Sequence, residues 1–105
     1  LDECHRAVEW IVHTQREDGS WGYFDQGTLE ETAYALTALL HCHGRFPIDD
    51  RLLHKGAAYL VRQMVEGYDN YLYPPLWIGK SLFVPRDIVR ASILAALKLY
   101  KETFD

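Results

Sequence analysis

The feature that most constrains the fold is a helical pattern that recurs at an interval of 49 residues. Segment 5–12, HRAVEWIV, aligns with segment 54–61, HKGAAYLV. In both copies a basic residue is followed by a small residue, and an aromatic residue is followed by two aliphatic ones. Repeats of this length with two helices per unit are typical of helical-hairpin arrays, which are seldom stable with only two units. The repeat therefore predicts part of a larger array and favours a fragment over a complete domain.

Apolar residues at the i, i+3, i+4 spacing predict two helices in the first unit. The first helix is expected to end at about Gln15. The second begins at Thr28, a favourable N-cap, with Glu31 three residues later in the arrangement of a capping box. It ends near Gly44.

The second unit carries the same two-helix signal. Its first helix follows Pro47, is capped by Asp49 or Asp50, and ends before Gly67. Its second helix opens at Pro85, a residue suited to a first helical turn.

The four predicted helices differ in how much of their surface is apolar. The first and third are polar on one side, whereas the second and fourth carry apolar residues on nearly every face. We therefore expect an all-α fold in which inner and outer helices alternate in two layers. The two repeats span about 2–44 and 49–104.

A turn motif joins the two helices of the first unit. The pattern Arg6-Ala7-x-x-Trp10-Ile11-x-x-x-Gln15 continues as DGSWG at 18–22. It resembles the QW repeat of squalene–hopene, oxidosqualene and class II diterpene cyclases, in which the Gln and Trp tie the end of an outer helix to the start of the neighbouring inner helix. The resemblance implies structural roles for the motif residues Gln15, Gly19 and Trp21. Their chemistry agrees, since glycine tolerates a positive φ and an indole offers an N–H and a stacking face.

Two further segments look like the C-terminal part of the β domain of bacterial and fungal class II diterpene cyclases. These are 27–35, GTLEETAYA, and 73–85, YPPLWIGKSLFVP. The resemblance implies that 1–105 is part of a β domain whose helical hairpins form an (α/α)6 toroid. Hopene-type enzymes have a similarly placed but more aromatic segment, whereas this sequence has Lys80 and Leu82 among its aromatic residues, which favours a diphosphate substrate over squalene. The second unit has Met64 where the motif expects Gln and lacks the Gly-x-Trp ending, so a bracing turn is not expected there.

The resemblance also implies an activity for the whole enzyme, an isomerase of the intramolecular lyase type. It would convert geranylgeranyl diphosphate into a bicyclic diphosphate of the copalyl type. Members of the class protonate an alkene with the central acid of an Asp-x-Asp-Asp motif. That motif is absent here, as is the Asp-Asp-x-x-Asp pattern of ionisation-type synthases. We expect no catalytic residue in this segment and no activity from it alone. The remaining β and γ domains are its expected partners, and magnesium is expected only through the substrate diphosphate.

Aromatic and basic residues are candidates for contacts with the substrate. The candidates for the cavity lining are Tyr34, Tyr73, Trp77 and Phe83. Their ring faces can stabilise a carbocation, and plain core packing is the alternative. Lys80 and Arg86 are candidates for binding the diphosphate, Arg86 because it lies close to a helix N-terminus. Solvated surface charge is the alternative for both.

Composition argues against several other classes of protein. The net charge of −4 and the absence of basic clusters argue against nucleic acid. No apolar run reaches the ~18 residues that would span a bilayer, so a cytoplasmic protein is expected. Cys4 and Cys42 are interpreted as reduced thiols. His41 and His43 are two residues apart and point to different sides of a helix, so no metal site is expected.

Two alternatives to the diterpene cyclase remain open at this point. One is a squalene–hopene-type triterpene cyclase, which the mass of the product would distinguish. The other is a non-catalytic helical-hairpin scaffold that binds a partner in an aromatic groove. Absence of an upstream Asp-x-Asp-Asp motif would favour the scaffold.

Overall fold

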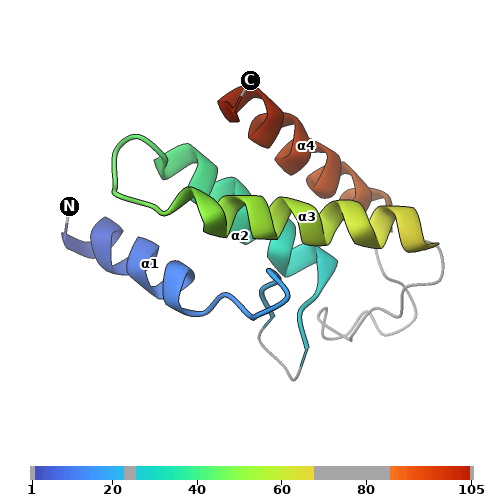
Figure 1. Cartoon of the computed structure of the whole chain (residues 1–105), viewed down its shortest axis with the longest axis horizontal. Coiled ribbons are helices and arrows are strands. Elements are labelled where there is room, and N and C mark those ends of the chain that lie inside the picture. The colour runs from blue at the N-terminus through green and yellow to red at the C-terminus, as the bar shows by residue number, and fades with distance from the viewer. Residues whose placement is uncertain (1, 23–25, 68–85, 105) are drawn as a thin grey trace.

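The computed structural model describes residues 2–22, 26–67 and 86–104, and most of these residues are helical (Figure 1). The helices are α1 (Asp2–His13), α2 (Leu29–Cys42), α3 (Asp50–Gly67) and α4 (Arg86–Phe104). The described residues form only isolated β-bridges and no named strand. The all-α prediction is therefore confirmed.

The end of α1 lies at His13, two residues before the predicted end at Gln15. Thr14 caps this end: its hydroxyl donates to the Trp10 carbonyl at 2.8 Å and its backbone N–H donates to the same oxygen at 3.1 Å. The N–H bond is the last i→i−4 bond of this end, and the hydroxyl is a second donor to the same carbonyl. Gln15 lies beyond the end of α1, in the following turn.

The start of α2 is set by Thr28, as predicted. Its hydroxyl accepts a hydrogen bond from the Glu31 N–H at 3.0 Å and lies 3.1 Å from the Glu31 carboxylate. In a full capping box the carboxylate accepts from the backbone N–H of the cap residue. Here that N–H donates to the Trp21 carbonyl at 2.9 Å, so the carboxylate accepts from the hydroxyl instead.

Replacement of Thr28 by alanine is expected to lower the free energy of unfolding by about 1–2 kcal/mol, since the cap of α2 and a buried hydroxyl contact are both lost. Thr28→Ser keeps the hydroxyl and is the matched control. Urea denaturation followed by far-UV circular dichroism measures both variants. Equal losses in the two variants would mean that the methyl group, and not the cap, carries the effect.

The start of α3 decides between the two acidic candidates. The Asp49 carboxylate accepts a hydrogen bond from the Arg51 N–H at 2.9 Å, and Asp50 is the first helical residue. Asp49 is therefore the cap. Asp50 instead lies 2.9 Å from the imidazole Nε2 of His43, at the other end of the connection.

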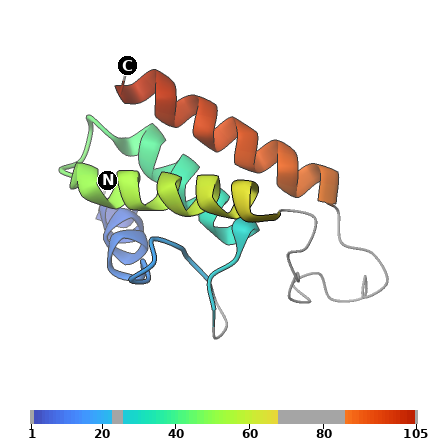
Figure 2. The ribbon, with the colours of Figure 1, turned by 45° about the vertical axis from the view of Figure 1, so that its right-hand side comes forward.

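Helix α2 is the centre of the packing and contacts α1, α3 and α4 (Figures 1 and 2). Seven of its residues are buried: Leu29, Glu30, Thr32, Ala33, Leu36, Leu39 and Leu40. The matching core residues of α3 are Leu53, Ala57, Tyr59 and Leu60. Burial of these apolar side chains is the main stabilising contribution to the fold.

Helix α4 packs one apolar stripe and leaves another apolar face open. Val89, Ile93 and Ala96 recur at helical spacing and are buried. Leu94, on a different side, is 52% exposed. The apolar surface predicted around this helix is therefore only partly covered by the described residues.

Candidate functional site

The best-formed local structure outside the helices is the turn from Gln15 to Trp21, here called the QW turn. Its backbone is closed by hydrogen bonds from the Arg16 N–H to the Ser20 carbonyl at 2.8 Å and from the Gly19 N–H to the Arg16 carbonyl at 2.9 Å. The Asp18 carboxylate accepts from the Ser20 N–H at 3.0 Å and from the Ser20 hydroxyl. These bonds hold the turn in one conformation before any helix contact is considered.

The Asp18 carboxylate is held in its charged form by this geometry. Partial burial acts to raise the pKa of Asp18, but the two hydrogen bonds from Ser20 and the charges of Arg62 and Arg16 outweigh it. The pKa therefore lies below the usual value for an aspartate.

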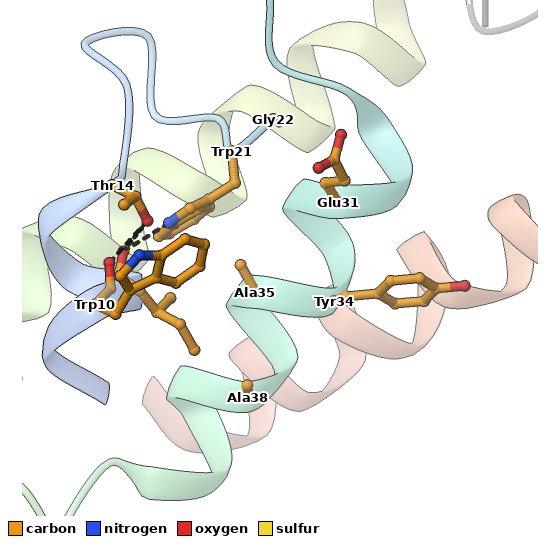
Figure 3. Close-up of a pocket in the computed structure, with 9 residues that line it drawn as sticks. Trp10, Thr14, Trp21, Gly22, Glu31, Tyr34, Ala35 and Ala38 are labelled. Atoms are coloured by element: carbon orange, nitrogen blue, oxygen red, sulfur yellow. Dashed lines mark hydrogen bonds between the residues drawn. The ribbon is translucent and has the colours of Figure 1, made fainter. Parts of the chain in front are cut away.

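Trp21 ties the end of α1 to the start of α2. Its indole N–H donates to the Ile11 carbonyl in the last turn of α1 at 2.7 Å (Figure 3). Its backbone N–H donates to the Thr32 hydroxyl of α2 at 2.9 Å, and its carbonyl accepts from the Thr28 N–H. The residue is 4% exposed, so these bonds lie out of water, where an unmade bond is costly.

Gln15 extends the connection to a third helix. Its side-chain amide donates to the Gly19 carbonyl at 3.0 Å and to the Leu52 carbonyl in the first turn of α3 at 2.9 Å. The resemblance implied a tie between an outer helix and the adjacent inner helix. In the structure Trp21 makes that tie, and Gln15 reaches the next helix of the outer type.

The QW turn approaches α3 closely enough to require glycine at position 19 and to favour it at position 56. Gly19 has a φ of +92°, and a Cβ there would collide with the Lys55 carbonyl oxygen of α3. On α3, a Cβ at Gly56 would lie 3.2 Å from Cζ3 of Trp21. The indole therefore lies directly against the helix backbone.

A pocket of about 500 Å³ opens beside the QW turn, between α1 and α2 (Figure 3). It is lined by Trp10, Ile11, Thr14, Trp21, Gly22, Glu31, Tyr34, Ala35 and Ala38. The small side chains Ala35 and Ala38 leave room on α2, and Trp10, which is 66% exposed, flanks the space from α1. The lining is mainly apolar, as in many sites for apolar ligands or side chains.

Tyr34 is the one predicted cavity residue whose side chain is described. It belongs to the pocket lining, yet its ring points toward α4 (Figure 3). Its hydroxyl donates to the Glu30 carboxylate at 3.1 Å and is also hydrogen-bonded with Ser92 of α4. Burial raises the pKa of Tyr34, Glu30 adds to the rise, and the bond with Ser92 opposes it. The phenol is thus kept protonated and joins α2 to α4.

The other predicted contacts with substrate are not described. Tyr73, Trp77, Lys80 and Phe83 lie outside the described residues, and of Arg86 only the backbone, as the first residue of α4, is described. Of the predicted site residues, the structure thus places Tyr34 in the pocket lining and the three motif residues Gln15, Gly19 and Trp21 in one turn.

Several contact residues were not predicted as such. Thr32 binds the backbone of Trp21, Leu52 accepts a hydrogen bond from the QW turn through its carbonyl group, and the Lys55 backbone lies close to Gly19. The pocket had a local signal, because Ala35 and Ala38 are small residues spaced three apart on α2. Backbone contacts from a distant helix leave no such signal.

The described residues show neither a metal centre nor a membrane span. Within 2–22, 26–67 and 86–104, no group of three or more His, Cys, Asp or Glu side chains is placed to hold a metal ion. No helix in those ranges combines the length and the apolar character needed to cross a bilayer.

The described residues define an all-helical protein with a bracing turn between α1 and α2, and sequence comparison shows which enzymes it resembles. No family model matches the chain. A type B diterpene cyclase of Mycobacterium tuberculosis is 40% identical over 103 residues, which are 95% of this chain and 19% of the relative. A copalyl diphosphate synthase of Streptomyces anulatus is 40% identical over 99 residues, 94% of this chain and 17% of the relative.

The name of a third relative indicates a different product. The labda-7,13-dienyl diphosphate synthase of Streptomyces clavuligerus is 41% identical over 97 residues, 92% of this chain and 16% of the relative. The chain thus spans less than a fifth of the length of these relatives. It is homologous to one segment of the class II diterpene cyclases.

Proposed function

We propose that this chain is a segment of a protonation-initiated diterpene cyclase that converts geranylgeranyl diphosphate into a bicyclic diphosphate of the copalyl type. The observation that carries the proposal is 40% identity to a copalyl diphosphate synthase over nearly the whole chain. The QW turn supports it, because its three motif residues lie together and connect three helices. The names of these two relatives describe diphosphate products and not triterpenes.

In the proposed enzyme this segment forms part of the wall of the helical barrel, and its QW turn holds neighbouring helices together. The reaction would run by protonation of an alkene, ring closure and loss of a proton, with the acid and base outside this sequence, since no Asp-x-Asp-Asp motif occurs in it. The repeats 2–44 and 49–104 would be two hairpins of an (α/α)6 toroid.

Substrate contacts are proposed for residues of the second unit. Tyr73, Trp77 and Phe83 would line the cavity with Tyr34, and Lys80 and Arg86 would meet the diphosphate. Magnesium would arrive with the substrate diphosphate, as the resemblance to class II diterpene cyclases implies. No step of the reaction is assigned to the metal.

The test uses the longer protein that contains this sequence. Incubation with geranylgeranyl diphosphate is expected to give a bicyclic diphosphate, identified by mass spectrometry after dephosphorylation, and squalene is expected to remain unchanged. Replacement of the central Asp of an upstream Asp-x-Asp-Asp by Asn is expected to abolish turnover, and the isolated 105-residue chain is expected to be inactive.

Three outcomes would contradict the proposal. Conversion of squalene alone would identify a triterpene cyclase. Absence of the upstream motif together with absence of turnover would indicate a scaffold. Turnover by the isolated chain would show that the acid lies within it.

A further inference from the structure

Glu30 is a buried acidic residue in the first turn of α2. It is 6% exposed, and its carboxylate accepts a hydrogen bond from the Tyr34 hydroxyl at 3.1 Å. The N–H groups at the start of a helix favour a negative charge, and a hydrogen-bonded charge is less costly to bury than an isolated one. The position of Glu30 therefore suits a negative charge inside the protein, next to an aromatic ring.

Tyr34 lies one helical turn after Glu30 and is much less buried, with 48% of the residue exposed. Its ring points toward α4 (Figure 3), where Ser92 makes the second hydrogen bond of the phenol. Because the phenol proton is directed to Glu30, the Ser92 hydroxyl is the donor in this second bond. The phenol is thus the exposed neighbour of a buried carboxylate, and two hydrogen bonds fix its position.

Tyr34 lies on the side of α2 that faces away from α3. Leu36, two residues later, faces α3, because its Cδ1 atom would lie 3.5 Å from a Cβ placed on Gly56. Successive residues turn by about 100° around a helix, so Tyr34 and Leu36 lie on opposite sides of α2. In the proposed toroid α3 belongs to the outer layer, and the side of α2 that carries Tyr34 faces the cavity.

We propose that Tyr34 determines product specificity by screening the Glu30 carboxylate from the carbocations of the reaction, an inference that rests on the proposed function. A negative charge near the cavity stabilises a cation without touching it. A carboxylate in contact with the cation would instead remove a proton from a carbon next to the cationic carbon. The electrons of that C–H bond would form a double bond between the two carbons, and the proton would end on a Glu30 oxygen.

The ring of Tyr34 prevents this loss of a proton by keeping the two reacting groups apart. A general base takes a proton only when its oxygen comes within about 3 Å of the atom that carries the proton. The ring occupies the exposed side of the Glu30 carboxylate, and the phenol proton occupies its Oε2 atom. Glu30 is therefore not the base that ends the normal reaction.

Carbodiimide labelling tests the screening independently of activity, in the longer protein that contains this sequence. A water-soluble carbodiimide with glycine ethyl ester modifies accessible carboxylates, and mass spectrometry measures Glu30 relative to Glu9, an exposed reference on α1. Glu30 is expected to stay at background in the wild type and in Tyr34→Phe, which keeps the ring, and to be clearly modified in Tyr34→Ala. An unmodified Glu30 in Tyr34→Ala, or a modified Glu30 in the wild type, would overturn the proposal.

Product analysis with geranylgeranyl diphosphate tests the chemical consequence. Tyr34→Ala is expected to form additional diphosphates with a displaced double bond, and its kcat is expected to fall about tenfold because a cation–π contact is also lost. Glu30→Gln in the Tyr34→Ala background is expected to remove the additional products, since an amide is a far weaker base than a carboxylate. Tyr34→Phe is expected to form none of them. Additional products that persist in the double variant would show that the enlarged cavity alone is responsible, and would overturn the role of Glu30.

Circular dichroism checks that each variant is folded. If Tyr34→Ala does not fold, Tyr34→Leu takes its place in both measurements, because leucine fills more of the space and still lacks the ring.

The screening and the proposed activity fail separately. A wild-type protein that leaves geranylgeranyl diphosphate unchanged would contradict the proposed activity, and the labelling of Glu30 would still decide the screening. An active wild type whose Tyr34→Ala variant keeps Glu30 unmodified would overturn the screening alone.

Discussion

Replacement of Trp21 by alanine is expected to lower the free energy of unfolding of this chain by about 3–5 kcal/mol, as is usual for loss of a buried tryptophan. The side chain is 4% exposed, lies against Gly56 and donates to the Ile11 carbonyl at 2.7 Å. Its loss opens a cavity at the junction of three helices. Since an array of only two hairpins is expected to have little stability to spare, a large loss of helical circular dichroism at 37 °C is expected as well.

Trp10 provides the matched control within the same chain. Because its side chain is 66% exposed, Trp10→Ala is expected to change the stability of the 105-residue chain by less than about 0.5 kcal/mol. Trp21→Phe is expected to fall between the two, since it keeps most of the ring and loses the indole N–H bond, worth about 1 kcal/mol. Urea denaturation measures all three, and similar losses for Trp10→Ala and Trp21→Ala would contradict the structure.

Replacement of Gly19 by alanine is expected to be the second severe change. Its φ of +92° costs an alanine about 1–2 kcal/mol, and the new Cβ would also collide with the Lys55 carbonyl oxygen of α3. Relief of that collision requires the QW turn to move away from α3, which stretches the bond from Gln15 to the Leu52 carbonyl. A total loss of about 3–4 kcal/mol is therefore expected.

Gly44 separates the two contributions to this loss. It has nearly the same φ, +94°, but a Cβ there would meet no atom within 4 Å. Gly44→Ala is therefore expected to cost only the backbone contribution of about 1–2 kcal/mol. Thermal denaturation of both variants makes the comparison, and equal midpoints would show that close approach to α3 contributes nothing.

The helices and their caps were predictable because their signals are local. Thr28 and Glu31 are three residues apart, and both act within the first turn of α2. Which of Asp49 and Asp50 caps α3 could not be predicted from the residues nearby in the sequence. Asp50 is engaged by His43 across the connection between α2 and α3, and sequence spacing does not reveal that contact.

The sequence predicted which residues form the candidate site, but it did not predict their contacts with α3. The motif indicated Gln15, Gly19 and Trp21 as a bracing turn, yet the bond from Gln15 to Leu52 spans 37 residues and ends on a backbone carbonyl. Any side chain at position 52 would present that carbonyl, so the sequence holds no signal for it. The different burial of Trp10 and Trp21 depends in the same way on where α3 lies.

The hydrogen bond between Gln15 and Leu52 also affects where segments of two homologous sequences can be joined in a chimaera. The hydrogen bonds of the QW turn of one repeat end on the next repeat, so its contacts run from the end of α1 to the start of α3. A chimaera joined between 44 and 49 would place the two sides of this contact in different parents, whereas a junction in the middle of α3 would keep them together.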